Sequence, residues 1–148
     1  MNVAVQTSQY VAIPLSASVE RADVISKIMR SLCEFETIFT DYQVACKSKC
    51  FACPQCFIAL DVVSRMLTRA DARVWEVWDT SEDDAKIVGI LYLTSILPGA
   101  DAQAHFAFFD RKLGDKTSLL EEMISWTFAD HDDWQALQRL TIEIPDFA

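Results

Sequence analysis

With 148 residues, 51% of them hydrophobic, the chain is long and apolar enough to form one globular domain with its own core. Its three glycines argue against nucleotide-binding folds that depend on several glycine-rich turns. The formal net charge of −9, with lysines and arginines scattered singly, argues against nucleic-acid binding, because phosphate backbones repel an acidic surface. The same charge favours a cationic or amine-bearing partner, although it also serves solubility alone.

The first half of the chain shows one strand pattern and two helical ones. Residues 10–15 (YVAIPL) predict a strand that is an edge strand or ends at Pro14, because proline cannot donate to a ladder. Ser18 is a plausible N-cap for a helix over residues 19–33, whose apolar residues recur at helical spacing. Residues 34–56 show no clean period, and a second helical pattern begins at Phe57.

Two strands with a polar loop between them follow. Residues 73–79 are rich in β-branched and aromatic residues, and residues 86–94 are almost continuously apolar, as in a strand covered on both faces. Trp75 and Trp78 are expected on opposite faces of the first of these strands. Gly89 in the second suggests a bulge or a close backbone approach.

The last third predicts a turn, a strand, a helix and a strand. Pro98–Gly99 forms the turn, and residues 102–109 form the strand. Ser118 and Glu121 form a capping box that opens the helix. The apolar side of this helix contains Leu119, Leu120, Met123, Ile124 and Phe128. Residues 137–144 alternate between polar and apolar side chains, which predicts the last strand.

This order predicts a single α/β (α+β) domain over residues 1–148, with a mixed central sheet of about five strands flanked by three helices. The order resembles the first two-thirds of the GNAT (GCN5-related N-acetyltransferase) fold. Residues 88–145 look most like small GNAT-type proteins encoded by tailed phages. The resemblance implies a GNAT-like domain that binds acetyl-CoA.

The cofactor loop of the family follows its fourth strand and cradles the pyrophosphate at a helix N-terminus. The family pattern is Arg or Gln, two variable residues, Gly, one variable residue, then Gly or Ala. The corresponding residues here are Arg111, Lys112, Leu113, Gly114, Asp115 and Lys116. Arg111 and Gly114 match the pattern. Lys116 departs from it, and its side chain would either block the phosphates or add a charge contact that Asp115 would oppose.

Acyl transfer in this family also needs a general base, and the candidates are His105 and Glu143. The alternatives are a packed or surface histidine and a solvated strand position. In the family, a region beyond the fifth strand usually supplies a tyrosine that protonates the leaving thiolate. The sequence here ends at Ala148, and Tyr10, Tyr42 and Tyr92 lie elsewhere. The last strand is therefore expected to expose an edge that a protein partner or a second copy covers.

Four cysteines within eleven residues form a separate cluster: Cys46, Cys50, Cys53 and Cys56. Thiolates at such spacing can bind zinc or an iron–sulfur cluster. A structural zinc site usually combines two separated pairs, so one tight run is poor geometry, and buried or incidental thiols are the alternative.

Two functions follow from these residues. The first is an acetyl-CoA-dependent N-acetyltransferase, intact or degenerate. The second is a non-catalytic GNAT-fold interaction or assembly protein, such as a phage virion component. The polar start of the chain lacks the apolar core of a signal peptide, and no apolar run is long enough to span a bilayer. We therefore expect no membrane partner and a cytoplasmic location, in the host cytoplasm or the virion if the protein is phage-encoded.

Overall fold

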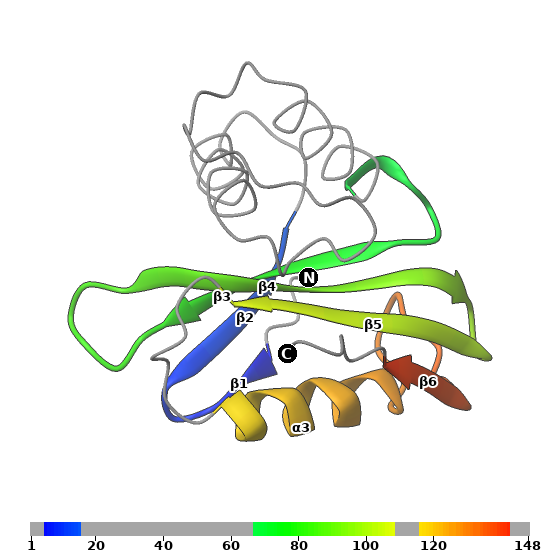
Figure 1. The fold of residues 1–148 in the computed structure, drawn as a ribbon. Helices are drawn as coiled ribbons and strands as arrows, with labels where there is room; N and C mark the ends of the chain where they lie inside the picture. Colours follow the sequence, from blue (N-terminus) through cyan, green and yellow to red (C-terminus); the bar gives the residue numbers. More distant parts are fainter. Residues whose placement is uncertain (1–4, 16–66, 109–115, 143–148) are drawn as a thin grey trace, which may run out of the picture.

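A computed structural model describes residues 5–15, 67–108 and 116–142 of the chain, which form one β-sheet with a helix on one face (Figure 1). The elements are β1 (Val5–Gln6), β2 (Tyr10–Pro14), β3 (Arg73–Asp79), β4 (Lys86–Leu97), β5 (Asp101–Phe108), α3 (Lys116–Thr127) and β6 (Arg139–Ile142). The helix predicted at 19–33 lies outside the described residues. So does the one that begins at residue 57, apart from the helical residues Leu67 and Thr68.

The sheet has the strand order β1-β2-β3-β4-β5-β6. Neighbouring strands are antiparallel except β5 and β6, which are parallel and are connected through α3. A parallel pair needs such a crossover, because its two strands run in the same direction. The predicted mixed α+β class is confirmed, and β1 adds a sixth strand to the five predicted.

Strand β1 was missed because two residues are too few for an alternating pattern. It pairs with β2 through Val5↔Ala12 and Gln6↔Val11, so β2 is not an edge strand. Strand β2 does end at Pro14, and the Leu15 N–H still donates to the Val74 carbonyl at 2.8 Å.

Two bulges interrupt β4. The register with β3 shifts after Val77, so that Val88 is the extra residue beside Gly89, which confirms the irregularity predicted there. A second bulge contains Ser95, whose φ of 51° is uncommon for a residue with a Cβ atom. The strand continues through this bulge to Leu97, three residues beyond its predicted end.

The predicted turn at Pro98–Gly99 joins β4 to β5. The Ala100 N–H donates to the Leu97 carbonyl at 2.9 Å, and Gly99 has a φ of 71°. Proline followed by a residue with positive φ is the pattern of a type II turn, which favours glycine at that position. The two predicted residues therefore occupy the positions that their backbone preferences demand.

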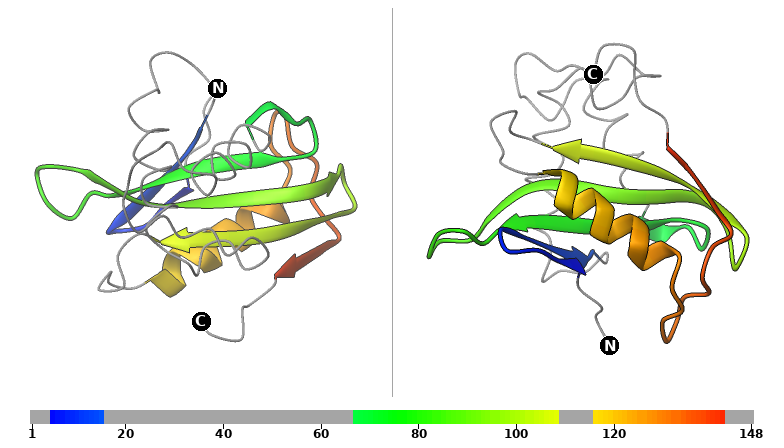
Figure 2. Two further views of the ribbon diagram at one scale, coloured as in Figure 1. Left: turned by 45° about the horizontal axis from the view of Figure 1, so that its top comes forward. Right: turned by 90° about the horizontal axis from the view of Figure 1, so that it is seen from below.

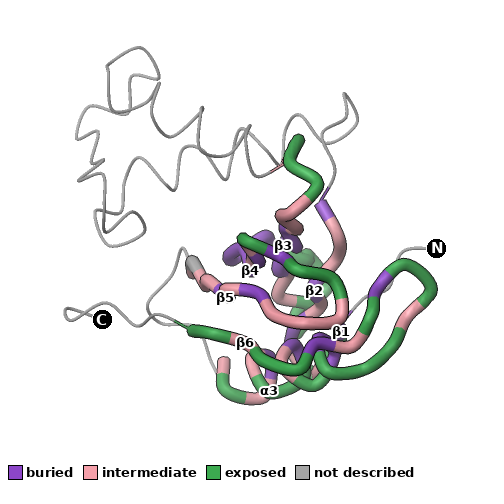
Figure 3. Tube along the Cα trace, turned by 90° about the vertical axis from the view of Figure 1, so that its right-hand side faces the viewer, coloured by how far each residue is buried: buried purple, intermediate pink, exposed green. Residues whose placement is uncertain are grey.

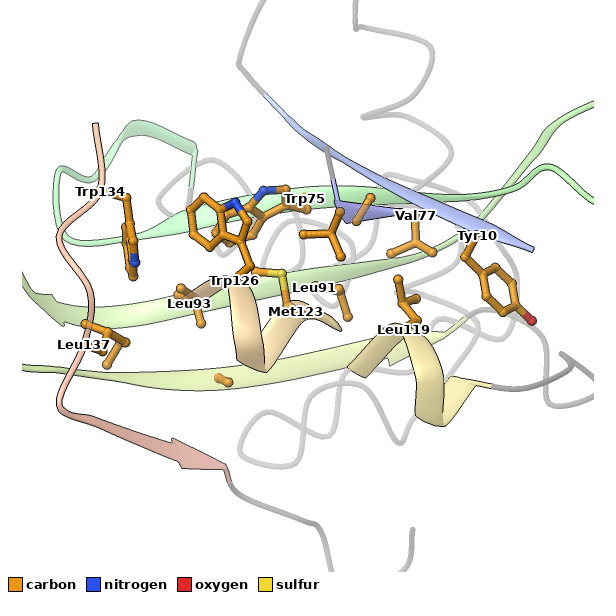
Figure 4. Close-up of a cluster of buried hydrophobic side chains, with 14 of the residues drawn as sticks. Tyr10, Trp75, Val77, Leu91, Leu93, Leu119, Met123, Trp126, Trp134 and Leu137 are labelled. Carbon is orange, nitrogen blue, oxygen red and sulfur yellow. The ribbon is translucent and has the colours of Figure 1, made fainter. Parts of the chain in front are cut away.

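The core lies between the sheet and α3, which crosses one face of the sheet in both views of Figure 2. Its largest buried side chain is Trp75 from β3, and Trp126 from α3 meets it edge to face at 5.3 Å between ring centroids (Figure 4). Other core residues labelled in the close-up are Tyr10, Val77, Leu91, Leu93, Leu119, Met123, Trp134 and Leu137.

Three local predictions at the end of the chain are wrong. Lys116 and Thr117 are already helical, so Ser118 lies inside the first turn of α3 and is not its N-cap. Phe128 follows the last helical residue and is 43% exposed, so it does not belong to the buried side of the helix. Strand β6 begins at Arg139, two residues later than predicted, because the Leu137 N–H donates to the Thr127 carbonyl at the end of α3.

Candidate functional site

The second half of β5 borders the candidate site. Strand β5 pairs with β6 from Asp101↔Arg139 to Ala104↔Ile142, where the described part of β6 ends. From His105 to Phe108, the described partner of β5 is β4. Along this half the side chains alternate, so Phe106 and Phe108 pack against the core and His105 faces the opposite side of the sheet.

Lys116 is the first described residue of α3 and lies beside the end of β5. Its ammonium nitrogen is 5.0 Å from the centre of the Phe108 ring, which is a cation–π distance. The first turn of α3 contains no acidic residue. The ammonium charge therefore adds to the positive end of the helix dipole, and this end of the helix favours an anion.

His105 lies on the other face of β5 in a small cluster with two residues of β4. Its ring is stacked on that of Tyr92, with centroids 4.6 Å apart and planes 10° apart. Its Nε2 atom lies 3.0 Å from the Thr94 hydroxyl oxygen. Either atom can donate, because the hydroxyl rotates and neutral imidazole has two tautomers. These contacts hold a half-buried imidazole in a single orientation.

Glu76 lies on the same face as His105 and was not singled out by its sequence pattern. It pairs with Ile90, two residues from Tyr92 along β4, so Glu76, Tyr92 and His105 form a diagonal row across three strands. Only 1% of Glu76 is exposed, and its Oε1 accepts a hydrogen bond from the Trp78 indole N–H at 3.0 Å. A buried carboxylate is costly to desolvate, so an acidic residue between Trp75 and Trp78 was a usable signal.

The structure does not bring the predicted site residues into one cluster. His105 and Lys116 flank opposite faces of β5. The predicted base Glu143 lies outside the described residues. So do the loop residues Arg111, Lys112, Leu113, Gly114 and Asp115 and the cysteines Cys46, Cys50, Cys53 and Cys56.

Within residues 5–15, 67–108 and 116–142, no group of three or more histidine, cysteine or carboxylate side chains could hold a metal ion. The predicted cysteine site is not among these residues and stays a prediction. The described part of the chain also contains no helix that is long and apolar enough to cross a bilayer.

No protein-family model matches the chain, and no curated protein matches it significantly. Among solved structures, a domain from Methanocaldococcus jannaschii aligns with a TM-score of 0.49 and 10% identity, covering 78% of this chain and 68% of that one. Spermidine N-acetyltransferase from Vibrio cholerae, in complex with CoA and spermine, aligns with a TM-score of 0.49 and 13% identity over 82% and 65% of the two chains.

Ribosomal-protein-S5-alanine acetyltransferase from Vibrio fischeri aligns with a TM-score of 0.47 and 15% identity over 85% and 67% of the two chains. This chain thus spans about two-thirds of the length of each of these three proteins. At such identities and TM-scores, these alignments say nothing about the activity of this protein.

Proposed function

We propose that this protein binds acetyl-CoA along the second half of β5 and transfers its acetyl group to an amine. The observation that supports this most directly is the junction of β5 and α3. There, the Lys116 ammonium and the helix dipole place positive charge beside the Phe108 ring at the end of β5. The resemblance to GNAT proteins implies a pyrophosphate at this helix N-terminus, although the family pattern has Gly or Ala where Lys116 stands.

We propose that the backbone of residues 105–108 takes part in the same site. An extended ligand with amide groups can pair with a strand edge through main-chain hydrogen bonds, as added peptide strands do. The pantetheine arm of CoA carries two such amides. Bound along this edge, it would extend from Lys116 on one face of β5 toward His105 on the other.

We assign His105 the role of general base in this reaction. The amine nitrogen attacks the thioester carbonyl carbon, the new N–C bond forms as the C–S bond breaks, and the departing thiolate takes up a proton from solvent. The proton lost by the amine passes to the His105 imidazole, which Tyr92 and Thr94 hold in position. The acidic net charge of −9 would attract a cationic amine, which must lose a proton before it attacks.

Replacing Lys116 with glutamate tests the proposed site. We expect about tenfold weaker acetyl-CoA binding by isothermal titration calorimetry, roughly 1.4 kcal/mol, because a carboxylate replaces the ammonium beside the phosphates. Arg139→Glu is the matched control, since it changes the net charge equally at the other end of the β5–β6 pair. It should leave the affinity within about twofold, a loss that corresponds to roughly 0.4 kcal/mol.

The wild-type protein must itself bind for this comparison to have meaning. Acetyl-CoA at about 100 times its dissociation constant should raise the melting temperature by about 5–10 °C. No thermal shift at millimolar acetyl-CoA would contradict the proposed function. An equal loss of affinity in both charge variants would contradict the assigned site.

A second candidate function, a non-catalytic interaction or assembly protein, is favoured by strand β6. This strand is last in the described sheet, three of its four residues are exposed, and Ile142 is 37% exposed (Figure 3). An exposed strand edge pairs readily with another chain. On this reading we expect size-exclusion chromatography with light scattering to show a dimer or larger assembly that Ile142→Lys weakens. A wild-type monomer that binds acetyl-CoA would contradict it.

A further inference from the structure

A row of polar side chains crosses three strands on the face of the sheet opposite α3. Gln103 of β5 pairs with Thr94 of β4 on one side and with Thr141 of β6 on the other. Ala102 and Ala104, the neighbours of Gln103 in the strand, belong to the core beneath α3. Because side chains alternate along a strand, Gln103 points away from that core. We call Thr94, Gln103 and Thr141 the Gln103 row.

The Gln103 row lies directly beside the proposed base. His105 is the next residue of β5 on the same face, and two residues along a strand span about 7 Å. The Thr94 hydroxyl oxygen lies 3.0 Å from the His105 Nε2 atom. Thr94 is therefore both a member of the Gln103 row and a contact of the imidazole, so the row and His105 are parts of one surface.

The Gln103 side chain has hydrogen-bonding capacity that a ligand can use. Gln103 and Thr94 are half-buried, and Thr141 is exposed. No hydrogen bond joins the Gln103 side chain to another residue within the described ranges 5–15, 67–108 and 116–142. Its carbonyl oxygen can accept and its NH₂ group can donate. The amide can therefore bind an uncharged polar group of a ligand that lies along this face.

The charges beside the Gln103 row compensate each other. Asp101, which precedes Gln103 on the same face of β5, is ion-paired with Arg139 of β6, with 3.0 Å between Oδ2 and Nη2. The three side chains of the row are themselves uncharged. A cationic group placed beside Gln103 would meet no carboxylate in the row, whereas an amide group would find both a donor and an acceptor there.

We propose that Gln103 contacts the acyl acceptor and selects an amine that carries an uncharged amide roughly 7 Å from its nitrogen, two residue lengths along the strand. In this arrangement the amine nitrogen lies at His105 and the amide lies at Gln103. The inference rests on the proposed function, because it assigns the acceptor side of the same reaction. It adds a selectivity that the base alone does not provide.

Two acceptors of similar length test this selectivity. Glycylglycinamide carries an uncharged amide where putrescine carries a second ammonium group. In Gln103→Leu, we expect the ratio of kcat/KM for glycylglycinamide to kcat/KM for putrescine to fall about threefold to tenfold, the effect of losing one hydrogen bond. Gln103→Glu keeps the shape of the side chain and adds a carboxylate. It should raise kcat/KM for putrescine by about the same factor.

Gln138 supplies the matched controls, because it is an exposed glutamine that lies before β6 and outside the Gln103 row. Gln138→Leu should leave the ratio unchanged. Gln138→Glu changes the net charge as Gln103→Glu does, and at physiological salt it should raise kcat/KM for putrescine by less than about twofold. An equal effect of the two glutamate variants would show a response to net charge alone and would overturn the inference.

Two further results would also overturn it. One is a ratio in Gln103→Leu equal to that of the wild type, and the other is an equal loss of activity with both acceptors, which would show general damage. If the wild type transfers no acetyl group, NMR titration with glycylglycinamide alone decides the inference. A saturable shift of the Gln103 side-chain amide signal would support the acceptor site while the proposed function fails. No shift would overturn both.

Discussion

Trp126→Ala is expected to destabilise the protein by about 3–5 kcal/mol, the cost typical of removing a large aromatic side chain from a core. Trp126 is 8% exposed, and its ring contacts three others: Trp75 at 5.3 Å, Trp134 at 5.1 Å and His131 at 4.4 Å. Alanine leaves a cavity that all three rings border. Because α3, β3 and the turn before β6 meet at this ring, their mutual packing is lost together. The measurement is urea unfolding followed by circular dichroism.

Phe128→Ala is the control for this prediction. It also removes an aromatic ring, two residues after Trp126, but Phe128 is 43% exposed. It should change the free energy of unfolding by about 0.5 kcal/mol or less. If Trp126→Ala costs less than about 1 kcal/mol, or no more than Phe128→Ala, the aromatic cluster does not hold α3 to the sheet.

Ala104→Leu is expected to destabilise the protein by about 1–3 kcal/mol through overpacking. Ala104 is 3% exposed, belongs to the cluster beneath α3, and pairs with Leu93 on one side and Ile142 on the other. Protein interiors are close-packed, so three added carbon atoms force the neighbouring side chains or β6 to move. Acetyl-CoA affinity should fall as well under the proposed function, because Ala104 directly precedes His105, where the proposed site begins.

The control for the added volume is Gln103→Leu. Gln103 is adjacent to Ala104, and its half-buried side chain lies on the opposite face of β5. It adds apolar volume outside the helix-covered core and should change the free energy of unfolding by about 1 kcal/mol or less. A stabilised Ala104→Leu variant in the urea titration would show unfilled space in the cluster and would refute this account of the core.

Local patterns were sufficient for the central strands. Residues 73–79 form a strand with the predicted bounds, and Gly89 and Pro98–Gly99 mark the irregularity and the turn that their backbone preferences require. Such features depend on residues that are neighbours in the sequence, so they can be inferred without a partner strand. The capping box failed because Lys116 and Thr117 are already helical, and a helix start is a weak local preference that its context readily overrides.

The candidate site was only partly accessible from the sequence. His105 was identified by its residue type and strand, but its orientation depends on Tyr92 and Thr94 from a different strand. Glu76 was overlooked because an acidic residue in a strand is usually solvated, although its place between Trp75 and Trp78 was a signal; the structure shows it buried beside Trp78. The roles of Glu143, of the loop from Arg111 to Asp115 and of the cysteine cluster stay predictions.

The sequence by itself determined the fold class, the central strands and the acidic charge that disfavours nucleic acid, because these depend on composition and on short-range periodicity. The tertiary structure decided the pairing of β1 with β2, the register of β6 on β5 and the contact of Arg73 with Trp134. The last two join residues far apart in the sequence; the Arg73 guanidinium donates to the Asp133 carboxylate 60 positions away. Closing a long loop between distant segments has an entropic cost. The contacts that the folded chain makes between those segments must offset this cost, and so they determine which strands pair.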